Sequence, residues 1–383
     1  MTREPYFDES HRALAQLLRG FGDKYLRASG PDEADPNGRT RDLLRHLANA
    51  HVLEHAVPAP YGTMDLRSLV AARETLAYFS SLADTAFAMQ GLGSYPLSRA
   101  GTDVQKNRWL PEVVRGTVIC AFAVTEPEAG SDLAGIRTRA TPDGPIWKLR
   151  GVKTFISNAG IAGLYTVLAR SGDGDDHRGL SMFLVDADAP GFTVKPQEAM
   201  AAHPLGELRF EGTPAVLLGE EGKGYNLALA TLETFRPSVG AAACGIAARA
   251  LDEAVRHTQV RRQFGRPLAD LQATQMSLAE MSVELDAARA LVRHAAWLRD
   301  QGEARIPREA ATAKLYATEA AQNCAHLAIQ VHGGSGYVDD HPVERYFRDV
   351  RVTTLYEGTS QIQKLIIGRA ETGINALVPQ PLA

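Results

Sequence analysis

The stretch TVICAFAVTEPEAGSD, residues 117–132, marks the point at which the chain changes from helical to β-type sequence. Its first half, Val118–Val124, is apolar and β-branched as expected of a strand, and a turn-forming sequence follows it. Thr125, Ser131 and the flexible backbone at Gly130 offer hydroxyl and N–H groups that could hold a polar ring or a phosphate. A plain strand-to-turn transition would explain the same residues.

Short β-type runs continue from this point to about Leu218, divided by Gly, Pro and Asp. The predicted strands are Val118–Val124, Trp147–Ile156, Tyr165–Ala169, Met182–Val185, Phe192–Lys195 and Ala215–Leu218. Their spacing favours a compact antiparallel β domain over alternating βαβ units.

Helical patterns lie on both sides of this β region. Before it, we predict helices over Ser10–Leu26, Arg41–His51 and Asp65–Phe79. After it, one apolar seam at helical spacing consists of Leu278, Met281, Leu285, Ala288, Val292 and Ala295. The next helix is predicted from Pro307 to Val331, because proline favours a first turn and Gly333 and Gly334 stop the helix. The chain therefore reads as α, then β, then α, with domains at 1–116, 117–224 and 225–383.

Composition limits the kind of partner. The 383 residues include 41 Lys and Arg and 45 Asp and Glu, so the formal net charge is −4, and no strong field draws in nucleic acid or an anionic membrane. The first residues, MTREP, lack the apolar region of a signal peptide. The longest small-apolar stretch, Val239–Ala248, is far shorter than the roughly 20 residues of a spanning helix. Cys120, Cys244 and Cys324 are expected to be reduced and buried, so we expect a cytoplasmic protein.

Two further clusters have ordinary explanations when they are taken alone. Lys153–Asn158, with the sequence KTFISN, places an aromatic residue beside a hydroxyl at a strand end, where aromatic residues are usually core. Arg261–Gly265, with the sequence RRQFG, precedes Gln272 and Gln275 and offers arginines suited to phosphate recognition. Basic residues near the C-terminal end of a helix would explain these arginines equally well.

The last cluster contains a candidate base. Gln330–Tyr337 combines a helix end with a glycine-rich turn, and Glu357 lies between Tyr356 and a glycine. Desolvation raises a carboxyl pKa toward neutrality, which a general base for a weakly acidic C–H requires. Most Glu residues are simply surface charges, which is the alternative for Glu357. We interpret His332 as a capping or packing residue, because no partner stands at metal-ligand spacing, and we predict no metal site.

Taken together, AVTEPEAGSD, KTFISN, RRQFG, QVHGGSGY and YEGTSQIQ, in this order, resemble the acyl-CoA dehydrogenase family from about residue 10 to residue 370. The resemblance implies an α+β multi-domain fold with an N-terminal all-α domain, a middle antiparallel β-barrel-like domain and a C-terminal four-helix bundle. It also implies FAD as cofactor, oxidation of an acyl-CoA to a trans-2-enoyl-CoA, electron transfer to an electron-transfer flavoprotein, and a homo-oligomer, commonly a tetramer.

The resemblance also implies roles for individual residues. Glu357 is the catalytic base. The flavin is lined by Phe122, Val124, Thr125, Gly130 and Ser131 on one side and by Phe155, Ile156 and Ser157 on the other. A neighbouring subunit's FAD is reached by Arg261, Gln263, Phe264, Gln272, Gln330, Gly333 and Gly334, and Thr359 and Gln361 hold the adenosine-diphosphate part. The substrate is contacted by Ser131, Glu233, Arg236 and Tyr356.

Some features leave alternatives open. Where some family members carry the base on a helix, this chain has Phe235, so no second carboxylate competes with Glu357. The stretch Gln197–Gly206 departs from the family pattern and lacks an expected hydroxyl residue, which leaves the CoA contacts and the acyl preference open. Alternatives on the same fold are an acyl-CoA oxidase or flavin monooxygenase, an enzyme acting on carrier-protein-bound acyl groups, and a non-catalytic binding or assembly protein.

Overall fold

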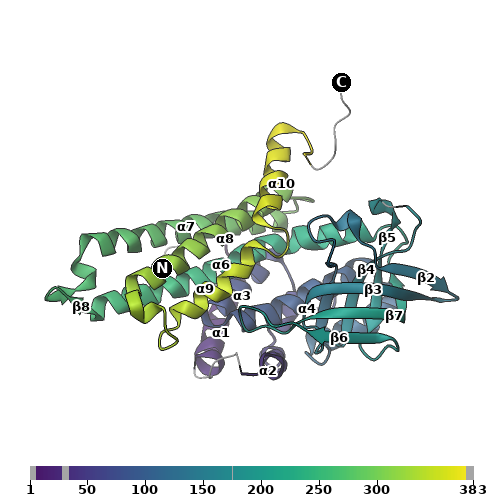
Figure 1. Cartoon of the computed structure of the whole chain (residues 1–383), viewed down its shortest axis with the longest axis horizontal. Coiled ribbons are helices and arrows are strands. Elements are labelled where there is room, and N and C mark those ends of the chain that lie inside the picture. The colour runs from purple at the N-terminus through teal and green to yellow at the C-terminus, as the bar shows by residue number, and fades with distance from the viewer. Residues whose placement is uncertain (1–5, 28–33, 175, 377–383) are drawn as a thin grey trace. The chain divides into compact units, whose positions relative to one another are not determined.

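The computed structural model describes residues 6–27, 34–174 and 176–376 (Figure 1). The N-terminal pentapeptide MTREP lies outside the described residues. The chain divides into two compact units, which we call the helical unit and the β unit. The helical unit comprises Met1–Ser29, Leu66–Ser81 and Glu233–Ala383, and the β unit comprises Gly30–Asp65 and Leu82–Leu232. The three domain ranges expected from the sequence stay a prediction.

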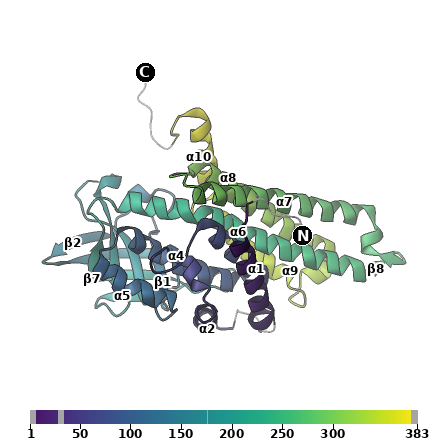
Figure 2. The ribbon, with the colours of Figure 1, turned by 180° about the vertical axis from the view of Figure 1, so that it is seen from behind.

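The helical unit is built from long helices. They are α1 (Glu9–Phe21), α3 (Leu66–Phe79), most of α6 (Gly224–Val260), α7 (Gln272–Asp300), α8 (Pro307–His332), α9 (Val343–Arg351) and α10 (Ser360–Thr372). Two short strands, β8 (Arg262–Gln263) and β9 (Arg266–Pro267), form a hairpin between α6 and α7. Helix α8 packs against α7, α9 and α10, as both views of the ribbon show (Figures 1 and 2).

The predicted apolar seam of α7 forms part of the core of this unit. Met281, Leu285, Ala288, Val292 and Ala295 are buried, whereas Leu278 at the start of the seam is half-buried. Small residues on α6 let the helices approach closely. A Cβ at Gly240 would lie 2.7 Å from Val292, and one at Gly245 would lie 2.2 Å from the carbonyl oxygen of Glu74 on α3. Glycine at these positions therefore sets the distance between the helices.

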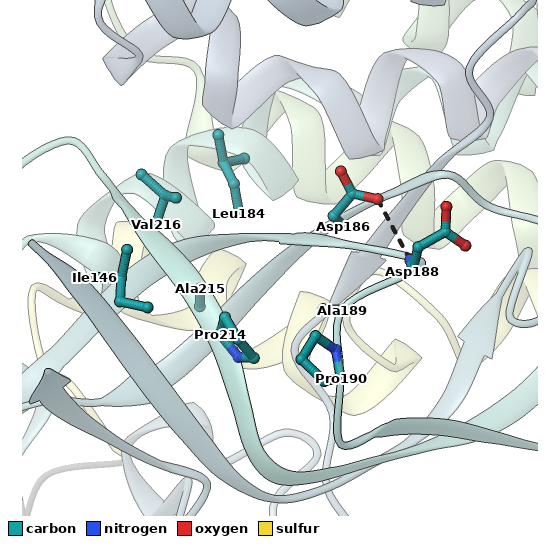
Figure 3. Close-up of a pocket in the computed structure, with 9 residues that line it drawn as sticks. All are labelled: Ile146, Leu184, Asp186, Asp188, Ala189, Pro190, Pro214, Ala215 and Val216. Carbon is teal, nitrogen blue, oxygen red and sulfur yellow. Dashed lines mark hydrogen bonds between the residues drawn. The ribbon is translucent and has the colours of Figure 1, made fainter.

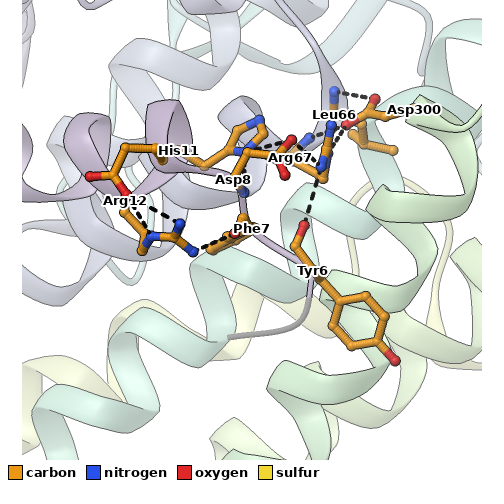
Figure 4. A network of polar contacts seen from close by, with 9 residues as sticks. Tyr6, Phe7, Asp8, His11, Arg12, Leu66, Arg67 and Asp300 are labelled. Atoms are coloured by element: carbon orange, nitrogen blue, oxygen red, sulfur yellow. Dashed lines mark hydrogen bonds and ion pairs between the residues drawn. The ribbon is translucent and has the colours of Figure 1, made fainter. Parts of the chain in front are cut away.

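The N-terminal segment is tied to α3 and α7 by a polar network (Figure 4). Both carboxylate oxygens of Asp300 accept hydrogen bonds from the first backbone N–H groups of α3, Leu66 at 2.9 Å and Arg67 at 3.0 Å. The Arg67 guanidinium bridges Asp300 at 2.9 Å and Asp8 at 2.8 Å. A carboxylate at a helix N-terminus satisfies N–H groups that the helix itself cannot pair. Asp300, the last residue of α7, therefore caps the N-terminus of α3, although the two are far apart in the sequence.

The predicted first helix differs from the observed one at its C-terminal end. The α-helix ends at Phe21, and a π-helical turn, Gly22–Leu26, replaces the expected last turn. A Cβ at position 22 would lie 2.3 Å from the ring of Phe79, so the aromatic side chain of α3 fills the space over this glycine. The helices predicted at Arg41–His51 and Asp65–Phe79 correspond to α2 (Pro36–Asn49) and α3.

The β unit contains the other helices and a seven-stranded sheet. The helices are α2, α4 (Ser81–Ala100) and α5 (Asp103–Val114), and the strands are β1 (Cys120–Ala123), β2 (Arg139–Asp143), β3 (Ile146–Ser157), β4 (Leu164–Arg170), β5 (Leu180–Asp186), β6 (Phe192–Pro196) and β7 (Leu205–Leu218). Pairing runs from β4 through β2, β3, β7 and β5 back to β4, so five strands close into a barrel. The predicted β-barrel-like domain between helical segments is confirmed.

Most strand pairs in the barrel are antiparallel. The exceptions are β1 with β4 and a single pair, Arg139 with Arg170, that joins β2 to β4. The sequence analysis missed β2, whose sequence RATPD is polar and contains a proline. It also found only the last four residues of β7. In its first half, Leu208 and Phe210 are buried whereas Arg209 and Glu211 are exposed, which is the alternation of a strand. The barrel packs on Leu97, Leu110 and Val113 of α4 and α5.

Candidate active site

The turn that carries Glu357 has an unusual backbone. It lies between a short 3₁₀ helix, Val352–Thr354, and α10, whose first turn is capped by the Thr359 hydroxyl. Glu357 has φ of 53° and Gly358 has φ of 94°. A left-handed conformation at a residue other than glycine costs on the order of 1–3 kcal/mol and persists only where the surroundings impose it. The structure therefore fixes Glu357 in a conformation that its own backbone disfavours.

Three side chains bind the two carbonyl oxygens of this turn. Arg236 Nε donates to the Glu357 oxygen at 3.1 Å, and Lys314 Nζ donates to the Gly358 oxygen at 2.8 Å. Gln363 Nε2 donates to both, at 3.3 Å and 2.8 Å. Lys314 and Gln363 are fully buried and Arg236 is 7% exposed. We call this set of contacts the carbonyl clamp. Arg236 was selected from the sequence, but Lys314 and Gln363 were not.

The other predicted residues of this region differ in their surroundings. The Glu233 carboxylate accepts from Arg305 at 3.0 Å and from the backbone N–H of Ile306 at 3.2 Å, just before α8. Tyr356 and Thr359 are half-buried, and Gln361 on α10 is exposed. Glu233 is thus engaged with the start of α8, while Gln361 is free to meet solvent or a ligand.

Two predicted clusters meet in the β unit. Thr125 follows β1, and its carbonyl oxygen accepts from the backbone N–H of Thr154 on β3 at 3.0 Å. At the adjoining positions, Lys153 Nζ donates to Glu126 Oε1 and to the Val124 carbonyl oxygen, both at 2.8 Å. The structure thus brings AVTEPEAGSD and KTFISN side by side. Phe122 and Thr125 are half-buried and Val124 is buried.

The pair Glu126–Lys153 is a buried ion pair. Burial lowers the pKa of Lys153 to about 8, against the opposing effect of Glu126. Burial also acts to raise the pKa of Glu126, but Lys153 and the hydrogen bonds around the carboxylate outweigh it and lower this pKa. Glu126 also accepts from the backbone N–H groups of Arg137 and Thr138, at 2.7 Å and 2.9 Å. The pair therefore holds the loop after β1 in place.

A bulge in β3 presents the second cluster. The register with β7 shifts between Lys153 and Ile156, and Phe155 in the bulge has φ of 57°. The Phe155 side chain is 63% exposed, whereas Ile156 is buried. Gln197 Oε1 accepts from the Phe155 backbone N–H at 3.1 Å. Strained backbone of this kind occurs most often at functional sites.

His203 was missed by the sequence analysis, although it lies in the stretch that departs from the family pattern. Its Nε2 is 2.7 Å from the hydroxyl of Ser157, and burial lowers its pKa to about 4. The imidazole is therefore neutral at pH 7. Gly130 and Ser131 are exposed on the loop after β1, and a Cβ at position 130 would meet nothing within 4 Å.

The third cluster is exposed. Arg261, Gln263 and Phe264 lie at the β8–β9 hairpin, and Phe264 is 90% exposed with φ of 53°. Gln272 at the start of α7 is exposed, as are Gln330, Gly333 and Gly334 at the end of α8. His257 on α6 stacks on His332 at 4.1 Å between ring centroids, so the ends of α6 and α8 lie together.

A pocket in the β unit involves none of the predicted site residues (Figure 3). Ile146, Leu184, Pro214, Ala215 and Val216 line it together with Asp186, Asp188, Ala189 and Pro190. Within the described ranges, no group of three or more His, Cys, Asp or Glu side chains is arranged to hold a metal ion. The three cysteines are free and buried, and none of the helices in the described part of the chain is long and apolar enough to cross a membrane.

Comparison with known proteins assigns the family. Models of the acyl-CoA dehydrogenase N-terminal, middle and C-terminal domains match residues 8–117, 121–213 and 222–372. The chain belongs to the acyl-CoA dehydrogenase family. It is 36% identical to a probable acyl-CoA dehydrogenase of Mycobacterium tuberculosis, over 96% of this chain and 97% of the relative. It is 42% identical to the acryloyl-CoA reductase (NADH) of Anaerotignum propionicum, over 70% of each chain.

Solved structures of acyl-CoA dehydrogenase relatives share the fold. A glutaryl-CoA dehydrogenase of Mycobacterium smegmatis in complex with FADH2 is 30% identical, with a TM-score of 0.90 and 98% of each chain covered. A structure described as the electron transferring flavoprotein of Acidaminococcus fermentans is 32% identical, with a TM-score of 0.90, covering 96% of this chain and 98% of that chain. The predicted acyl-CoA dehydrogenase fold is therefore confirmed, and the family is FAD-dependent.

Proposed function

We propose that this protein oxidises an acyl-CoA thioester to a trans-2-enoyl-CoA with FAD as cofactor, and that Glu357 is the base that takes the α-proton. The observation that carries the proposal is the carbonyl clamp. Arg236, Lys314 and Gln363 bind the backbone of the Glu357–Gly358 turn. A catalytic group must be held rigidly for efficient proton transfer, and the clamp holds the backbone that carries Glu357.

The proposed chemistry determines what Glu357 has to do. The α C–H of a thioester is a weak acid, so the base must lie within hydrogen-bond reach of it and the enolate oxygen must be stabilised. In the proposal, the Glu357 carboxylate takes the proton, and the Glu357 backbone N–H donates to the thioester oxygen. Arg236 and Gln363 hold the carbonyl oxygen of Glu357 and so orient the Glu357–Gly358 peptide, which directly follows the peptide that carries this N–H.

The predicted flavin-contacting residues of the β unit carry chemical groups that suit FAD. The exposed ring of Phe155 and the hydroxyls of Thr125, Ser131 and Ser157 offer one aromatic face and several hydrogen-bonding groups, as a flavin ring requires. When bound, FAD supplies the acceptor for the hydride that leaves the β-carbon. We assign Phe122, Val124 and Gly130, with Ile156, to the same surface. Ser131, Glu233, Arg236 and Tyr356 are assigned to the substrate.

The remaining assignments concern partners. Arg261, Gln263, Phe264, Gln272, Gln330, Gly333 and Gly334 are assigned to the FAD of a neighbouring subunit, with Thr359 and Gln361 on the adenosine-diphosphate part. The residues assigned to the neighbouring subunit's FAD are exposed in a single chain, which supports a homo-oligomer, for which we propose a tetramer. We also propose an electron-transfer flavoprotein as electron acceptor, as membership of the family implies. We propose that the enzyme acts in the cytoplasm.

The proposal is tested by anaerobic bleaching of the flavin absorbance with straight, branched, cyclic and dicarboxylic acyl-CoAs. The wild-type protein is expected to bleach with at least one class, which identifies the acyl group. Glu357→Gln should retain FAD but lose at least about 100-fold in kcat, the usual scale for a positioned base. Glu220→Gln, which removes an exposed carboxylate, is the matched control and should keep full activity.

Four outcomes would count against the proposal. Unchanged turnover of Glu357→Gln would remove the assignment of the base. Absence of bleaching with every thioester would favour a non-catalytic role. If oxygen reoxidised the reduced protein faster than an electron-transfer flavoprotein does, the protein would be an oxidase. If it preferred carrier-protein thioesters over acyl-CoA in competition, the carrier-bound acyl group would be the substrate.

A further inference from the structure

Lys314 is a buried cation whose position the sequence alone does not explain. It lies on α8 among the buried residues Ala310, Ala313 and Ala317, and its side chain is fully buried. Burying an ammonium group is unfavourable unless it is hydrogen-bonded or paired. Its Nζ donates to the Gly358 carbonyl oxygen at 2.8 Å. Because burying this charge at a helix interface is unfavourable, we expect the charge of Lys314 to have a function.

Lys314 differs from the other two members of the carbonyl clamp. Gln363 is neutral and belongs to α10, the helix that directly follows the turn, and Arg236 binds the Glu357 oxygen from α6. Lys314 alone among the three brings a positive charge to the Gly358 oxygen. It reaches the turn from α8, 44 residues earlier in the chain. The turn is thus connected to α6, α8 and α10 by separate side chains.

The charges around the Glu357 carboxylate are of both signs. Lys314 and Arg236 are the cations, and both interact electrostatically with Glu357. Glu233 also interacts electrostatically with Arg236, and Glu319 with Lys314. Glu233 pairs with Arg305, and Glu319 accepts from the Ser360 hydroxyl. Both acids are therefore engaged by other groups. A neighbouring cation favours the ionised form of a carboxylate, which is the form that accepts a proton.

We propose that Lys314 is a positioning residue that holds the Glu357–Gly358 turn left-handed and keeps the Glu357 carboxylate in its proton-accepting form. This inference rests on the proposed function of Glu357 and adds a second residue to it. Lys314 does not contact the reacting atoms; it acts through the Gly358 carbonyl and through its charge.

Three variants separate the hydrogen bond from the charge. Lys314→Met removes both, Lys314→Gln keeps a donor without charge, and Lys314→Arg keeps the charge. Lys364→Met, which removes an exposed cation from α10, is the matched control. Each protein is measured for FAD content, thermal unfolding, and kcat and KM as functions of pH. Hydrogen exchange of the peptide covering residues 355–363 is measured in the cofactor-free protein.

The expected results differ between the variants. Lys314→Met should lower kcat on the order of tenfold, the kinetic equivalent of one hydrogen bond to a charged group, with little change in KM. It should also shift the acid limb of kcat/KM to higher pH and speed exchange in residues 355–363. Lys314→Gln should share the shifted acid limb but exchange more slowly than Lys314→Met, and Lys314→Arg should restore the acid limb.

The outcomes that overturn the inference differ from those that overturn the function. If folded Lys314→Gln keeps the wild-type acid limb, the charge has no role and the inference fails. If Lys314→Met does not fold, comparing the acid limbs of Lys314→Gln and Lys314→Arg still shows whether the charge has a role. Full turnover of Glu357→Gln would refute the proposed base, whereas faster exchange of the turn in Lys314→Met than in wild type would still establish the positioning contact.

Discussion

The ammonium of Lys153 lies 2.8 Å from a carboxylate oxygen of Glu126, and both side chains are buried in the β unit. The two residues come from motifs that the sequence suggested for flavin contacts, yet their own side chains join the two segments. The same ammonium donates to the Val124 carbonyl oxygen at 2.8 Å. The pair therefore shapes the proposed cofactor surface without being part of it.

Breaking this pair should destabilise the protein strongly. Glu126→Gln leaves the Lys153 ammonium without its counter-charge in the interior, and we expect a loss of about 3–5 kcal/mol in the free energy of unfolding. Urea denaturation measures this loss. The double variant Glu126→Gln/Lys153→Met should recover part of it, because no isolated charge remains buried.

The control for this prediction is the exposed pair Asp143–Lys148, whose side chains are 51% and 47% exposed. Asp143→Asn should change the unfolding free energy by only about 0–1 kcal/mol. Equal effects of Glu126→Gln and Asp143→Asn would show that the buried pair contributes no more than a surface contact.

His203 should make stability sensitive to acid. Its pKa is about 4 in the folded protein because of burial, against about 6.5 in the unfolded chain. As the pH falls from 6.5 toward 4, the unfolded chain binds a proton that the folded protein does not, so stability decreases with decreasing pH. His203→Asn should lose this part of the pH dependence in unfolding free energies at pH 7 and pH 5. An identical slope in both proteins would contradict the prediction.

Gly358 should not tolerate a side chain. Its φ is 94°, and a Cβ there would lie 2.6 Å from Gln363 Nε2, which is part of the carbonyl clamp. Gly358→Ala should cost on the order of 1–3 kcal/mol through strain and lower the turnover of acyl-CoA as well. Gly368→Ala on α10 is the control, because a Cβ there meets nothing within 4 Å, and it should be neutral or stabilising. A stable, fully active Gly358→Ala variant would show that the left-handed turn is dispensable.

Phe264 should matter for assembly and not for the fold of a single chain. Its ring is 90% exposed on the β8–β9 hairpin, on a backbone with φ of 53°, and we assign it to contacts with a neighbouring subunit. Phe264→Ser should reduce the molar mass in light scattering after size-exclusion chromatography and lower FAD content. Val104→Ser on α5, 80% exposed, should leave both unchanged. A wild-type mass and full FAD content in Phe264→Ser would contradict the proposed role of the hairpin.

Sequence alone determined the order of helices and strands and the positions of the motifs. The seam of α7, the start of α8 at Pro307 and the end of that helix near Gly333 all follow from side-chain periodicity and capping residues within one segment. Such signals depend on neighbouring residues and can be read locally. The first half of β7 shows the same alternation and was detectable, whereas β2, with its polar sequence, was not.

Only the tertiary structure decided which side chains meet. Lys314 reaches Gly358 across 44 residues, His203 reaches Ser157 across 46, and Lys153 reaches Glu126 across 27. These contacts arise because packing of helices and closure of the barrel bring distant segments together, and no local pattern specifies the partner. In the sequence, a lysine in an alanine-rich helix suggests a solvated charge. Only the fold shows that Lys314 is buried and donates a hydrogen bond to a backbone carbonyl oxygen.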